Sequence, residues 1–318
     1  MTAPLKIILA EPRGFCAGVD RAIEIVERAL NLYGAPVYVR HEIVHNRWVV
    51  DDLRKKGVIF VQEVDEIPDG AITVFSAHGI SEKVENSAKL RDLPIIDATC
   101  PLVTKVHKEA QRYEGDDKQI ILIGHEGHPE VEGTSGRVLN GVLLVQNVGD
   151  VAKLNVKNPD KLAYVTQTTL SVDDTKDIIS ALKQRFPNIT GPELRDICYA
   201  TQNRQNAVRD LAKQVDILLV IGSANSSNSN RLRDLASEIC TKAYLIDDAK
   251  DLNPGWFDNI TSVGITAGAS APEHLVQNVV KAVSTLRQTV IETLSGISEN
   301  TRFKLPPEVT GEKLLRNG

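Results

Sequence analysis

Several residue types and patterns are scarce or missing in this 318-residue chain, and each gap excludes a class of protein. It has only 6 Phe, 6 Tyr and 2 Trp, so Val, Ile, Leu and Ala must fill most of the core. The 37 Lys and Arg are outnumbered by 42 Asp and Glu, and the net charge of −5 argues against a nucleic-acid binder. No apolar run approaches the roughly 18 residues of a membrane span. Because Lys6 and Glu11 limit the first apolar stretch, no secretory signal is expected, and the cytoplasm is the predicted location.

Cysteines are also few, and familiar nucleotide motifs are missing. Four cysteines, at positions 16, 100, 198 and 240, are too few for a disulfide scaffold. No two of them form a Cys-x-x-Cys pair, which excludes zinc ribbons and thioredoxin-type redox motifs. No Walker A sequence and no G-x-G-x-x-G occur, so ATP and dinucleotides have no recognisable site.

What the chain does contain is a threefold repeat. Cys16, Cys100 and Cys198 each stand before a segment with helical apolar spacing, at intervals of 84 and 98 residues. A β-branched strand follows each helix, at 37–39, 120–123 and 217–221, and it opens into a polar segment that carries His45, His128 or Ser226. Further strands are predicted at 58–61, 142–145 and 243–246, and then at 72–76, 162–166 and 262–266, before His78, Thr168 and Ser270.

This repeat predicts an α/β fold of three pseudo-threefold-related domains, with mainly parallel sheets around a central cavity. The predicted domains are 17–99, 100–197 and 198–286, and residues 287–318 form a C-terminal tail. Short strands are expected to end at Cys100 (95–100) and at Cys198 (194–198). The third domain lacks a last strand of its own, which the N-terminal strand within residues 1–16 can supply. The alternative is chance βα periodicity in a two-domain protein.

The three cysteines are candidate metal ligands. Each lies just before a helix, where the helix dipole favours a thiolate, and three thiolates around one cavity would suit zinc or an iron–sulfur cluster. A single unpaired cysteine is more often a small buried core residue, but equivalent positions in three repeats favour ligation. Cys240 has no equivalent and is expected in the core.

Residues 41–45 read His-Glu-Ile-Val-His, which formally matches the H-E-x-x-H motif of zinc metalloproteases. That motif requires a helix, whereas these residues follow a strand pattern at 36–39, and no third ligand follows at the spacing of a metzincin. The metalloprotease interpretation is therefore disfavoured.

The polar segments suit an anionic ligand. In parallel sheets, ligands bind beyond the C-terminal ends of the strands, and hydroxyl, amide and imidazole donors at helix N-termini suit a phosphate or diphosphate. The candidates are His45, His78, His128, Thr168, Ser226, Ser227, Asn228 and Ser270. Helix capping is the alternative, and the more ordinary one for residues 226–230 alone. Glu130 is either a solvated surface carboxylate or a group that handles protons beside the anion.

At this point the motifs at 12–22, 76–79, 97–103, 127–133, 166–171, 227–232 and 268–272 carry a resemblance. They resemble the 4-hydroxy-3-methylbut-2-enyl diphosphate reductase (LytB) family, over about residues 7–280. The resemblance implies three α/β domains around a central iron–sulfur site. It also implies the last step of the non-mevalonate isoprenoid pathway, which removes an allylic hydroxyl with two electrons and two protons and yields isopentenyl and dimethylallyl diphosphates.

The resemblance implies a role for each candidate. Cys16, Cys100 and Cys198 would hold one [4Fe–4S] cluster whose fourth iron is open. The diphosphate would be surrounded by His45, His78, His128, Thr168, Ser226, Ser227, Asn228 and Ser270. Glu130 would deliver protons, with Thr168 and His128 relaying or orienting them. An external donor such as flavodoxin or ferredoxin would supply electrons to a monomeric enzyme. A zinc-dependent hydrolase and a non-catalytic metal-binding or redox-sensing protein are the rival classes.

Overall fold

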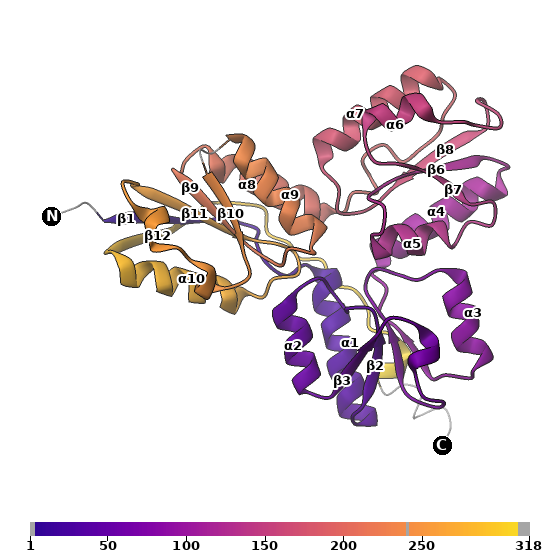
Figure 1. Cartoon of the computed structure of the whole chain (residues 1–318), viewed down its shortest axis with the longest axis horizontal. Coiled ribbons are helices and arrows are strands. Elements are labelled where there is room, and N and C mark those ends of the chain that lie inside the picture. Colours follow the sequence, from indigo (N-terminus) through magenta and orange to yellow (C-terminus); the bar gives the residue numbers. More distant parts are fainter. Residues whose placement is uncertain (1–3, 240–241, 311–318) are drawn as a thin grey trace. The chain divides into compact units, whose positions relative to one another are not determined.

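The computed structural model describes residues 4–239 and 242–310, and its strands form three separate sheets (Figure 1). The strands are β1 (Leu5–Leu9), β2 (Val37–Arg40), β3 (Val58–Val61), β4 (Thr73–Phe75), β5 (Ile95–Asp97), β6 (Gln119–Ile123), β7 (Val142–Val145), β8 (Leu162–Thr166), β9 (Ile217–Ile221), β10 (Lys242–Ile246), β11 (Ser262–Ala267) and β12 (Thr289–Thr293). The helices are α1 (Ala17–Tyr33), α2 (Arg47–Lys55), α3 (Glu82–Leu90), α4 (Pro101–Gly115), α5 (Pro129–Ser135), α6 (Val148–Lys153), α7 (Val172–Arg185), α8 (Tyr199–Ala212), α9 (Ser227–Ile239) and α10 (Glu273–Leu286).

The three sheets share one strand order, which supports the repeat. The β2 sheet runs β3-β2-β4-β5, the β6 sheet β7-β6-β8, and the β9 sheet β10-β9-β11-β1-β12. Every strand pair within the described residues is parallel, so the α/β class with parallel sheets is confirmed. The predicted completion of the third sheet is also confirmed, because β1 pairs with β11 in register Lys6↔Ser262.

The predicted strand at 194–198 is wrong, because residues 193–196 are turns. In the β6 sheet the fourth position holds only an isolated bridge between Ala163 and Thr190. Gly191 lies against the ring of Tyr164, where a Cβ would approach within 2.3 Å, and Pro192 has no N–H to donate to a ladder. The chain therefore leaves the sheet after Thr190, several residues before Cys198.

The sequence pattern also missed a strand. Residues 289–293, placed in the tail, form β12, which pairs with β1 at the edge of the β9 sheet in register Leu5↔Thr289. The β-branched Thr289, Val290, Ile291 and Thr293 suit an extended strand, but all except Thr289 remain exposed. With little buried area to mark it, this edge strand depends on hydrogen bonds to a strand from the other end of the chain.

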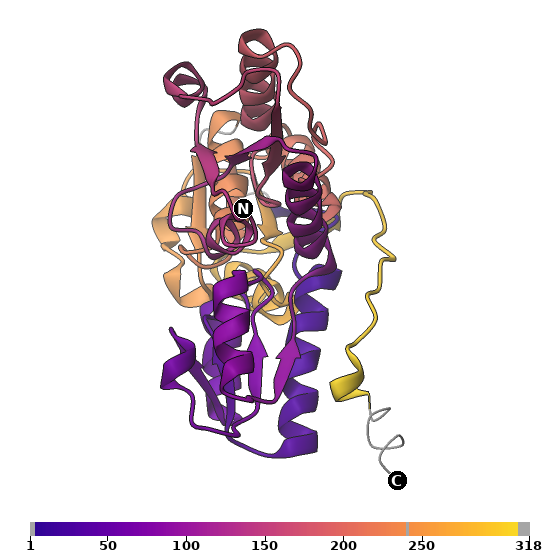
Figure 2. The same cartoon turned by 90° about the vertical axis from the view of Figure 1, so that its right-hand side faces the viewer.

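The chain divides into two compact units. Unit 1 comprises residues 1–19, 45–51 and 199–301 and contains the β9 sheet, whereas unit 2 comprises 20–44, 52–198 and 302–318 and contains the β2 and β6 sheets. The division into three domains with the predicted boundaries therefore stays a prediction. In unit 2 the last described segment runs alongside α1 (Figure 2). Arg21 Nε donates to Lys304 O at 2.8 Å, and Tyr33 Oη donates to Glu308 O at 2.7 Å.

Apolar side chains cover both faces of the β9 sheet. Alternation along β1 sends Leu5, Ile7 and Leu9 toward a cluster with α10, whereas Ile8 joins a cluster with α8 and α9. A sheet buried on both faces positions the C-terminal ends of its strands rigidly, and the polar turns follow at those ends. Among the helices between residues 4 and 310, apart from the two residues left undescribed, none is long and apolar enough to cross a membrane.

Candidate functional site

The predicted site residues divide evenly between the two units, and each set is described by itself. Unit 1 holds Cys16, His45, Ser226, Ser227, Asn228 and Ser270. Unit 2 holds Cys100, Cys198, His78, His128, Glu130 and Thr168. Cys240 lies outside the described residues, so its expected place in the core stays a prediction.

Each cysteine is joined to a polar turn by the same backbone hydrogen bond. The N–H of Cys16 donates to Ala269 O at 3.2 Å, that of Cys100 to Ala77 O at 3.0 Å, and that of Cys198 to Thr168 O at 3.0 Å. The acceptors lie in the turns that follow β11, β4 and β8, equivalent positions in the three sheets. Each cysteine is thereby brought beside one predicted binding residue: Ser270, His78 or Thr168.

The three cysteines are half-buried thiols, and the helices α1, α4 and α8 each begin at the very next residue, as predicted. The helix position alone does not produce a thiolate at Cys16. Burial raises the pKa of this thiol above its usual value of 9.0, against the lowering effect of the Arg204 guanidinium and of the Val19 and Gly18 N–H groups. A bound metal would overcome this cost, since a coordinating thiol is deprotonated outright.

The donor chemistry fits an iron–sulfur cluster, for which cysteine thiolates are the usual ligands. Cys16 lies in unit 1, whereas Cys100 and Cys198 lie in unit 2. Each of the three stands directly before a helix, and its backbone N–H is bound by an equivalent turn, which gives the three thiols a common local setting. Cysteines that only filled the core would have no reason to share this local setting.

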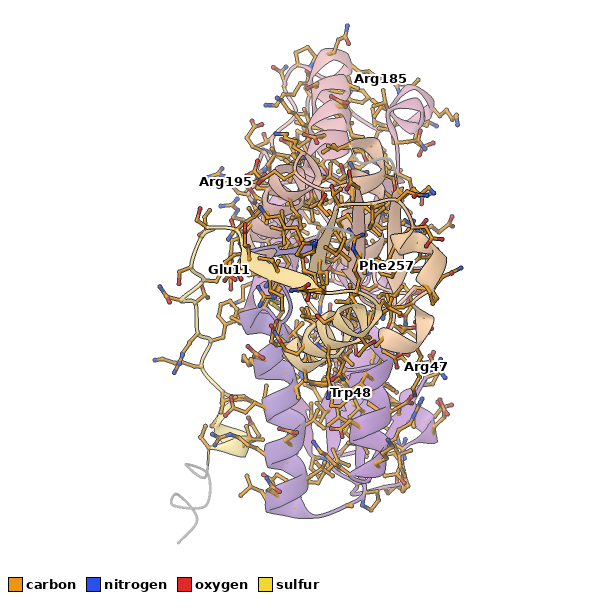
Figure 3. The ribbon with its side chains drawn as sticks, turned by 90° about the vertical axis from the view of Figure 1, so that its left-hand side faces the viewer. Glu11, Arg47, Trp48, Arg185, Arg195 and Phe257 are labelled. Atoms are coloured by element: carbon orange, nitrogen blue, oxygen red, sulfur yellow. The ribbon has the colours of Figure 1, made fainter. Side chains whose placement is uncertain are left out.

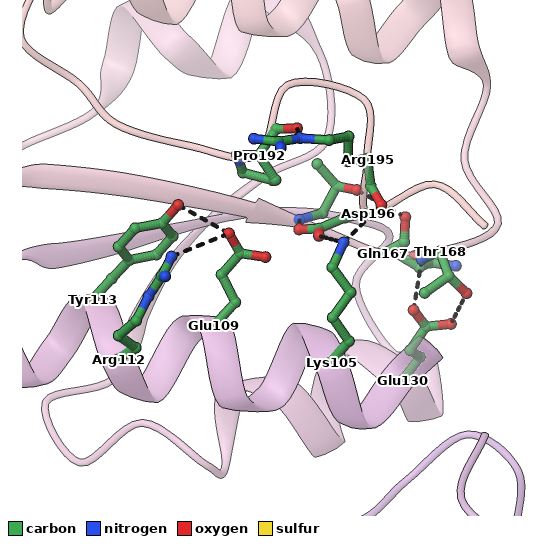
Figure 4. Close-up of polar contacts among 11 residues, drawn as sticks. Lys105, Glu109, Arg112, Tyr113, Glu130, Gln167, Thr168, Pro192, Arg195 and Asp196 are labelled. Carbon is green, nitrogen blue, oxygen red and sulfur yellow. Dashed lines mark hydrogen bonds and ion pairs between the residues drawn. The ribbon is translucent and has the colours of Figure 1, made fainter. Parts of the chain in front are cut away.

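Glu130 is deeply buried and hydrogen-bonded to Thr168 (Figure 4). It lies in the first turn of α5 and is 3% exposed, so the solvated-surface alternative is wrong. Its Oε1 accepts a hydrogen bond from Thr168 N–H at 2.5 Å, and its Oε2 lies 3.1 Å from Thr168 Oγ1. Because Thr168 O also accepts the Cys198 N–H, a short covalent and hydrogen-bonded path links this carboxyl to a cysteine.

Burial raises the pKa of Glu130 to about 7. The two hydrogen bonds from Thr168 lower it and the nearby charge of Asp196 raises it, but loss of hydration is the largest effect. A carboxyl with this pKa can both hold and release a proton near neutral pH, which is what a general acid requires.

His128 binds the backbone of Glu130, and His78 lies against His128 in unit 2. Nδ1 of His128 accepts the N–H of Glu130 at 3.1 Å, so in the neutral ring Nε2 carries the proton. The rings of His78 and His128 meet edge to face, with centroids 6.0 Å apart. Ser76 Oγ lies 3.4 Å from Nδ1 of His78. Two of the three imidazoles predicted to bind the anion are therefore neighbours.

In unit 1 the capping alternative is confirmed for Ser226 but not for Asn228. Ser226 Oγ accepts the N–H of Ser229 at 3.2 Å and its hydroxyl at 3.0 Å, so it caps α9. Asn228 is 4% exposed, and neither its Nδ2 nor its Oδ1 has a hydrogen-bond partner within the described parts of the chain. A buried amide without partners is costly, and a bound polar ligand would satisfy it.

A second turn of unit 1 positions His45. Ser270 Oγ donates to His45 O at 2.8 Å, and Ser223 Oγ accepts the N–H of Arg47 at 2.9 Å, which ties the start of α2 to the ends of β9 and β11. Figure 3 labels Trp48, whose ring centroid lies 4.0 Å from that of His274.

Residues 41–45 are not helical, and His41 has a φ of 60°, so rejection of the metalloprotease motif is confirmed.

The sequence pattern missed a charged cluster in unit 2 (Figure 4). Asp196 is 2% exposed; its Oδ2 accepts Thr166 N–H, and its Oδ1 lies 3.2 Å from Lys105 Nζ. Burial, and next the charge of Glu109, raise the pKa of Asp196 to about 6, while Lys105 lowers it. A charge just before a cysteine was the only signal that could have drawn attention to it.

Comparison with known proteins identifies the family. Residues 7–284 match the model of the LytB protein family. The 4-hydroxy-3-methylbut-2-enyl diphosphate reductase of Actinobacillus succinogenes is 59% identical over 308 residues, which cover 96% of this chain and 98% of the relative. That of Pseudoalteromonas translucida is 60% identical over 308 residues, which cover 96% of this chain and all of the relative.

Solved structures agree with this relationship. The structure of the corresponding reductase from Plasmodium falciparum matches with a TM-score of 0.94 and 40% identity, covering 99% of this chain and 100% of that one. Another reductase structure, described as the terminal enzyme of the non-mevalonate pathway, matches with a TM-score of 0.65 and 33% identity over 88% of this chain and 99% of that one. The resemblance seen in the sequence is confirmed, and the chain belongs to the LytB family.

Proposed function

We propose that this chain converts (E)-4-hydroxy-3-methylbut-2-enyl diphosphate into isopentenyl and dimethylallyl diphosphates, the last step of the non-mevalonate pathway. The observation that carries the proposal is about 60% identity to reductases of that name over nearly the full length of both chains. The allylic C–O bond breaks, two electrons and two protons enter, and the hydroxyl leaves as water.

Cys16, Cys100 and Cys198 are the proposed ligands of one [4Fe–4S] cluster, in which the fourth iron has no protein ligand. When bound, the cluster supplies electrons one at a time and an open Lewis-acidic iron for the hydroxyl oxygen. The protein's own contribution is a set of three thiols whose turns are fixed by equivalent hydrogen bonds. A rigid set of turns reduces the ordering cost of cluster binding.

Glu130 is the proposed proton donor. It is buried, it is bonded to Thr168, and its pKa of about 7 allows it to be protonated at the pH of the cell. The Thr168 hydroxyl can pass or orient this proton. It donates its own hydrogen to Glu130 Oε2, and its oxygen lone pairs stay available to accept a proton. His128, with its proton on Nε2 and its Nδ1 bound by the N–H of Glu130, is the proposed second donor.

The remaining candidates are the proposed ligands of the diphosphate: His45, His78, Ser226, Ser227, Asn228 and Ser270, with His128 and Thr168. The partnerless amide of Asn228 supports this assignment most directly. Neutral donors at the start of a helix favour an anion without requiring a fixed positive charge. Binding at this end of the substrate holds the distant C–O bond in position for reaction.

The finer aspects of the proposal follow from the family resemblance. We propose that the enzyme acts as a monomer in the cytoplasm and receives electrons from a small carrier protein such as flavodoxin or ferredoxin. Its substrate is an allylic diphosphate.

Serine variants of the cysteines test the proposal. After anaerobic reconstitution, Cys16→Ser, Cys100→Ser and Cys198→Ser should each lose the stable cluster and the reductase activity, whereas Cys240→Ser should retain both. Iron and sulfide per chain, the absorbance near 400 nm and product formation with a reduced donor are the measurements. A wild-type protein that binds zinc and stays colourless would instead favour a hydrolase, and a normal cluster in Cys198→Ser would remove that residue from the ligand set.

A further inference from the structure

Carbonyl groups one to three residues before each cysteine are bound by a cationic side chain from a helix distant in sequence. Arg21 on α1 binds the turn before Cys100, Lys105 on α4 binds the turn before Cys198, and Arg204 on α8 binds the turn before Cys16. These helices are the ones that begin directly after the three cysteines. Each contact lies within one compact unit.

Arg21 connects three segments of unit 2. Its Nη1 donates to Thr99 O at 3.1 Å and to Ala98 O at 3.3 Å, the two carbonyls that precede Cys100. Its Nε donates to Lys304 O in the C-terminal segment, which follows α1 in Figure 2.

Lys105 makes the corresponding contact before Cys198 (Figure 4). Its Nζ donates to Arg195 O at 2.8 Å and to Asp196 Oδ1 at 3.2 Å. The lysine side chain is 46% exposed, whereas the Asp196 side chain is fully buried. The amine thus reaches inward from the surface of α4 to the turn that carries the cysteine.

Arg204 makes the most extensive of the three contacts. It is 1% exposed and donates to Gly14 O at 2.7 and 3.0 Å and to Phe15 O at 3.1 Å, the carbonyls that precede Cys16. Its remaining nitrogen, Nη1, binds Ala200 O and both carboxylate oxygens of Glu299, the latter at 3.1 Å.

The contacts follow a cyclic order, since the helix after one cysteine supplies the cation for the next cysteine and the helix after Cys198 supplies it for Cys16. The cations stand 5, 5 and 6 residues after their own cysteines. A helix that needed only surface charge would not direct it three times to a carbonyl within three residues of a cysteine. The repetition therefore points to a common role.

We propose that Arg21, Lys105 and Arg204 are positioning residues that fix the three cysteine turns and place positive charge on the carbonyl groups of those turns. The inference rests on the proposed function, in which these cysteines hold the cluster. A cluster with thiolate ligands gains a further negative charge on reduction, and nearby positive charge stabilises that reduced state. The cations should therefore slow the loss of iron and raise the reduction potential.

The test uses the anaerobically reconstituted full chain and two variants that remove a cation, Arg21→Gln and Lys105→Met. The controls are Arg28→Gln on α1, which removes only an exposed pair with Glu24, and Lys108→Met on α4, which removes an exposed charge. Arg204 is too deeply buried for a neutral replacement to be informative, so Arg204→Lys, which keeps the charge, is used there.

Both cation-removing variants should reconstitute with wild-type iron, because all three cysteines remain. They should release iron to a ferrous chelator faster, by about 10-fold or more, since losing a group that orients a metal ligand lowers metal affinity by about 10- to 100-fold. Their midpoint potentials, measured by electron paramagnetic resonance during a redox titration, should shift to more negative values. Arg21→Lys and Arg204→Lys should keep the wild-type potential even if iron release is faster, while both controls should match the wild type.

Wild-type release rates and potentials in Arg21→Gln and Lys105→Met would overturn the inference. Faster release with an unchanged potential would also contradict it, since the contacts would then act only as a structural brace. Failure of the proposed function has a different result: the wild-type chain itself would bind no cluster.

Discussion

Glu130→Gln separates the proton chemistry of this carboxyl from its place in the fold. A glutamine has the same shape, can accept the Thr168 N–H through Oε1 and can donate to Thr168 Oγ1 through Nε2, so both contacts survive. What it loses is the proton that titrates with a pKa of about 7. Cluster content should be unchanged, because Glu130 is not a proposed ligand.

The magnitude follows from the shifted pKa. Between the ordinary value of 4.5 and about 7, the native state binds this proton more tightly than the unfolded chain does. The contribution of Glu130 to the free energy of unfolding is therefore fully present below pH 4.5 and is lost as pH rises to about 7, by about 3 kcal/mol in total. Glu130→Gln has no such loss. Between pH 4 and pH 8 its free energy of unfolding should therefore rise relative to that of the wild type by about 3 kcal/mol.

Turnover should change in the opposite direction. General acid catalysis typically contributes about 10²- to 10⁴-fold, so Glu130→Gln should be slower by that range. Wild-type turnover should decrease above about pH 7, as Glu130 loses its proton, and the residual activity of the variant should lack this decrease. Substrate affinity should hold or improve, because a negative charge near the diphosphate has gone.

The assay combines urea unfolding at pH 4, 5, 6, 7 and 8 with turnover driven by a chemical reductant over the range in which the enzyme stays folded. Glu132→Gln is the matched control, since Glu132 is an exposed carboxyl on the same helix α5. Wild-type turnover in Glu130→Gln would show that Glu130 is not the proton donor and would leave His128 or water as the candidate. Parallel pH curves of unfolding for the variant and the wild type would refute the assigned pKa.

Two further predictions concern other buried groups. Burial and the charge of Arg137 lower the pKa of His107 to about 4, so this imidazole lowers the free energy of unfolding as pH falls below 6.5. In urea unfolding, His107→Leu should therefore lose about 2 kcal/mol less than the wild type between pH 8 and pH 5. An equal loss in both proteins would contradict this. A Cβ at Gly268 would lie 2.0 Å from Ser229 Oγ and 3.3 Å from Asn228 Nδ2. Gly268→Ala should therefore lower the free energy of unfolding by about 1–3 kcal/mol and raise KM for the substrate. A wild-type free energy of unfolding together with a wild-type KM would contradict this.

The sequence by itself determined the local elements and their order. Helical spacing after Cys16, Cys100 and Cys198 correctly predicted helices that begin at the next residue, and short apolar runs located β3, β7 and β8 with their exact bounds. These signals are local, because a helix or a buried strand expresses its environment in the spacing of its own apolar residues. The cysteines and most polar turns were recognisable for the same reason, since each follows a well-marked element.

Only the tertiary structure decided which distant groups meet. Residues 194–198 looked like a strand, yet the packing of Gly191 on Tyr164 turned the chain away from its sheet. Conversely, β12 became a strand because β1 offered it a partner. Strand pairing is a non-local hydrogen-bonding choice, which a segment's own sequence does not contain.

The chemistry of the site depends on the same non-local contacts. Glu130 reads as an ordinary charged residue, and its pKa of about 7 arises because folding removes water from it and places Thr168 and Asp196 nearby. Arg21, Lys105 and Arg204 read as surface charges of three helices, and only the folded chain brings them to the carbonyls before the cysteines. Residue type was set by the sequence, but desolvation and partner were set by what packs against each residue.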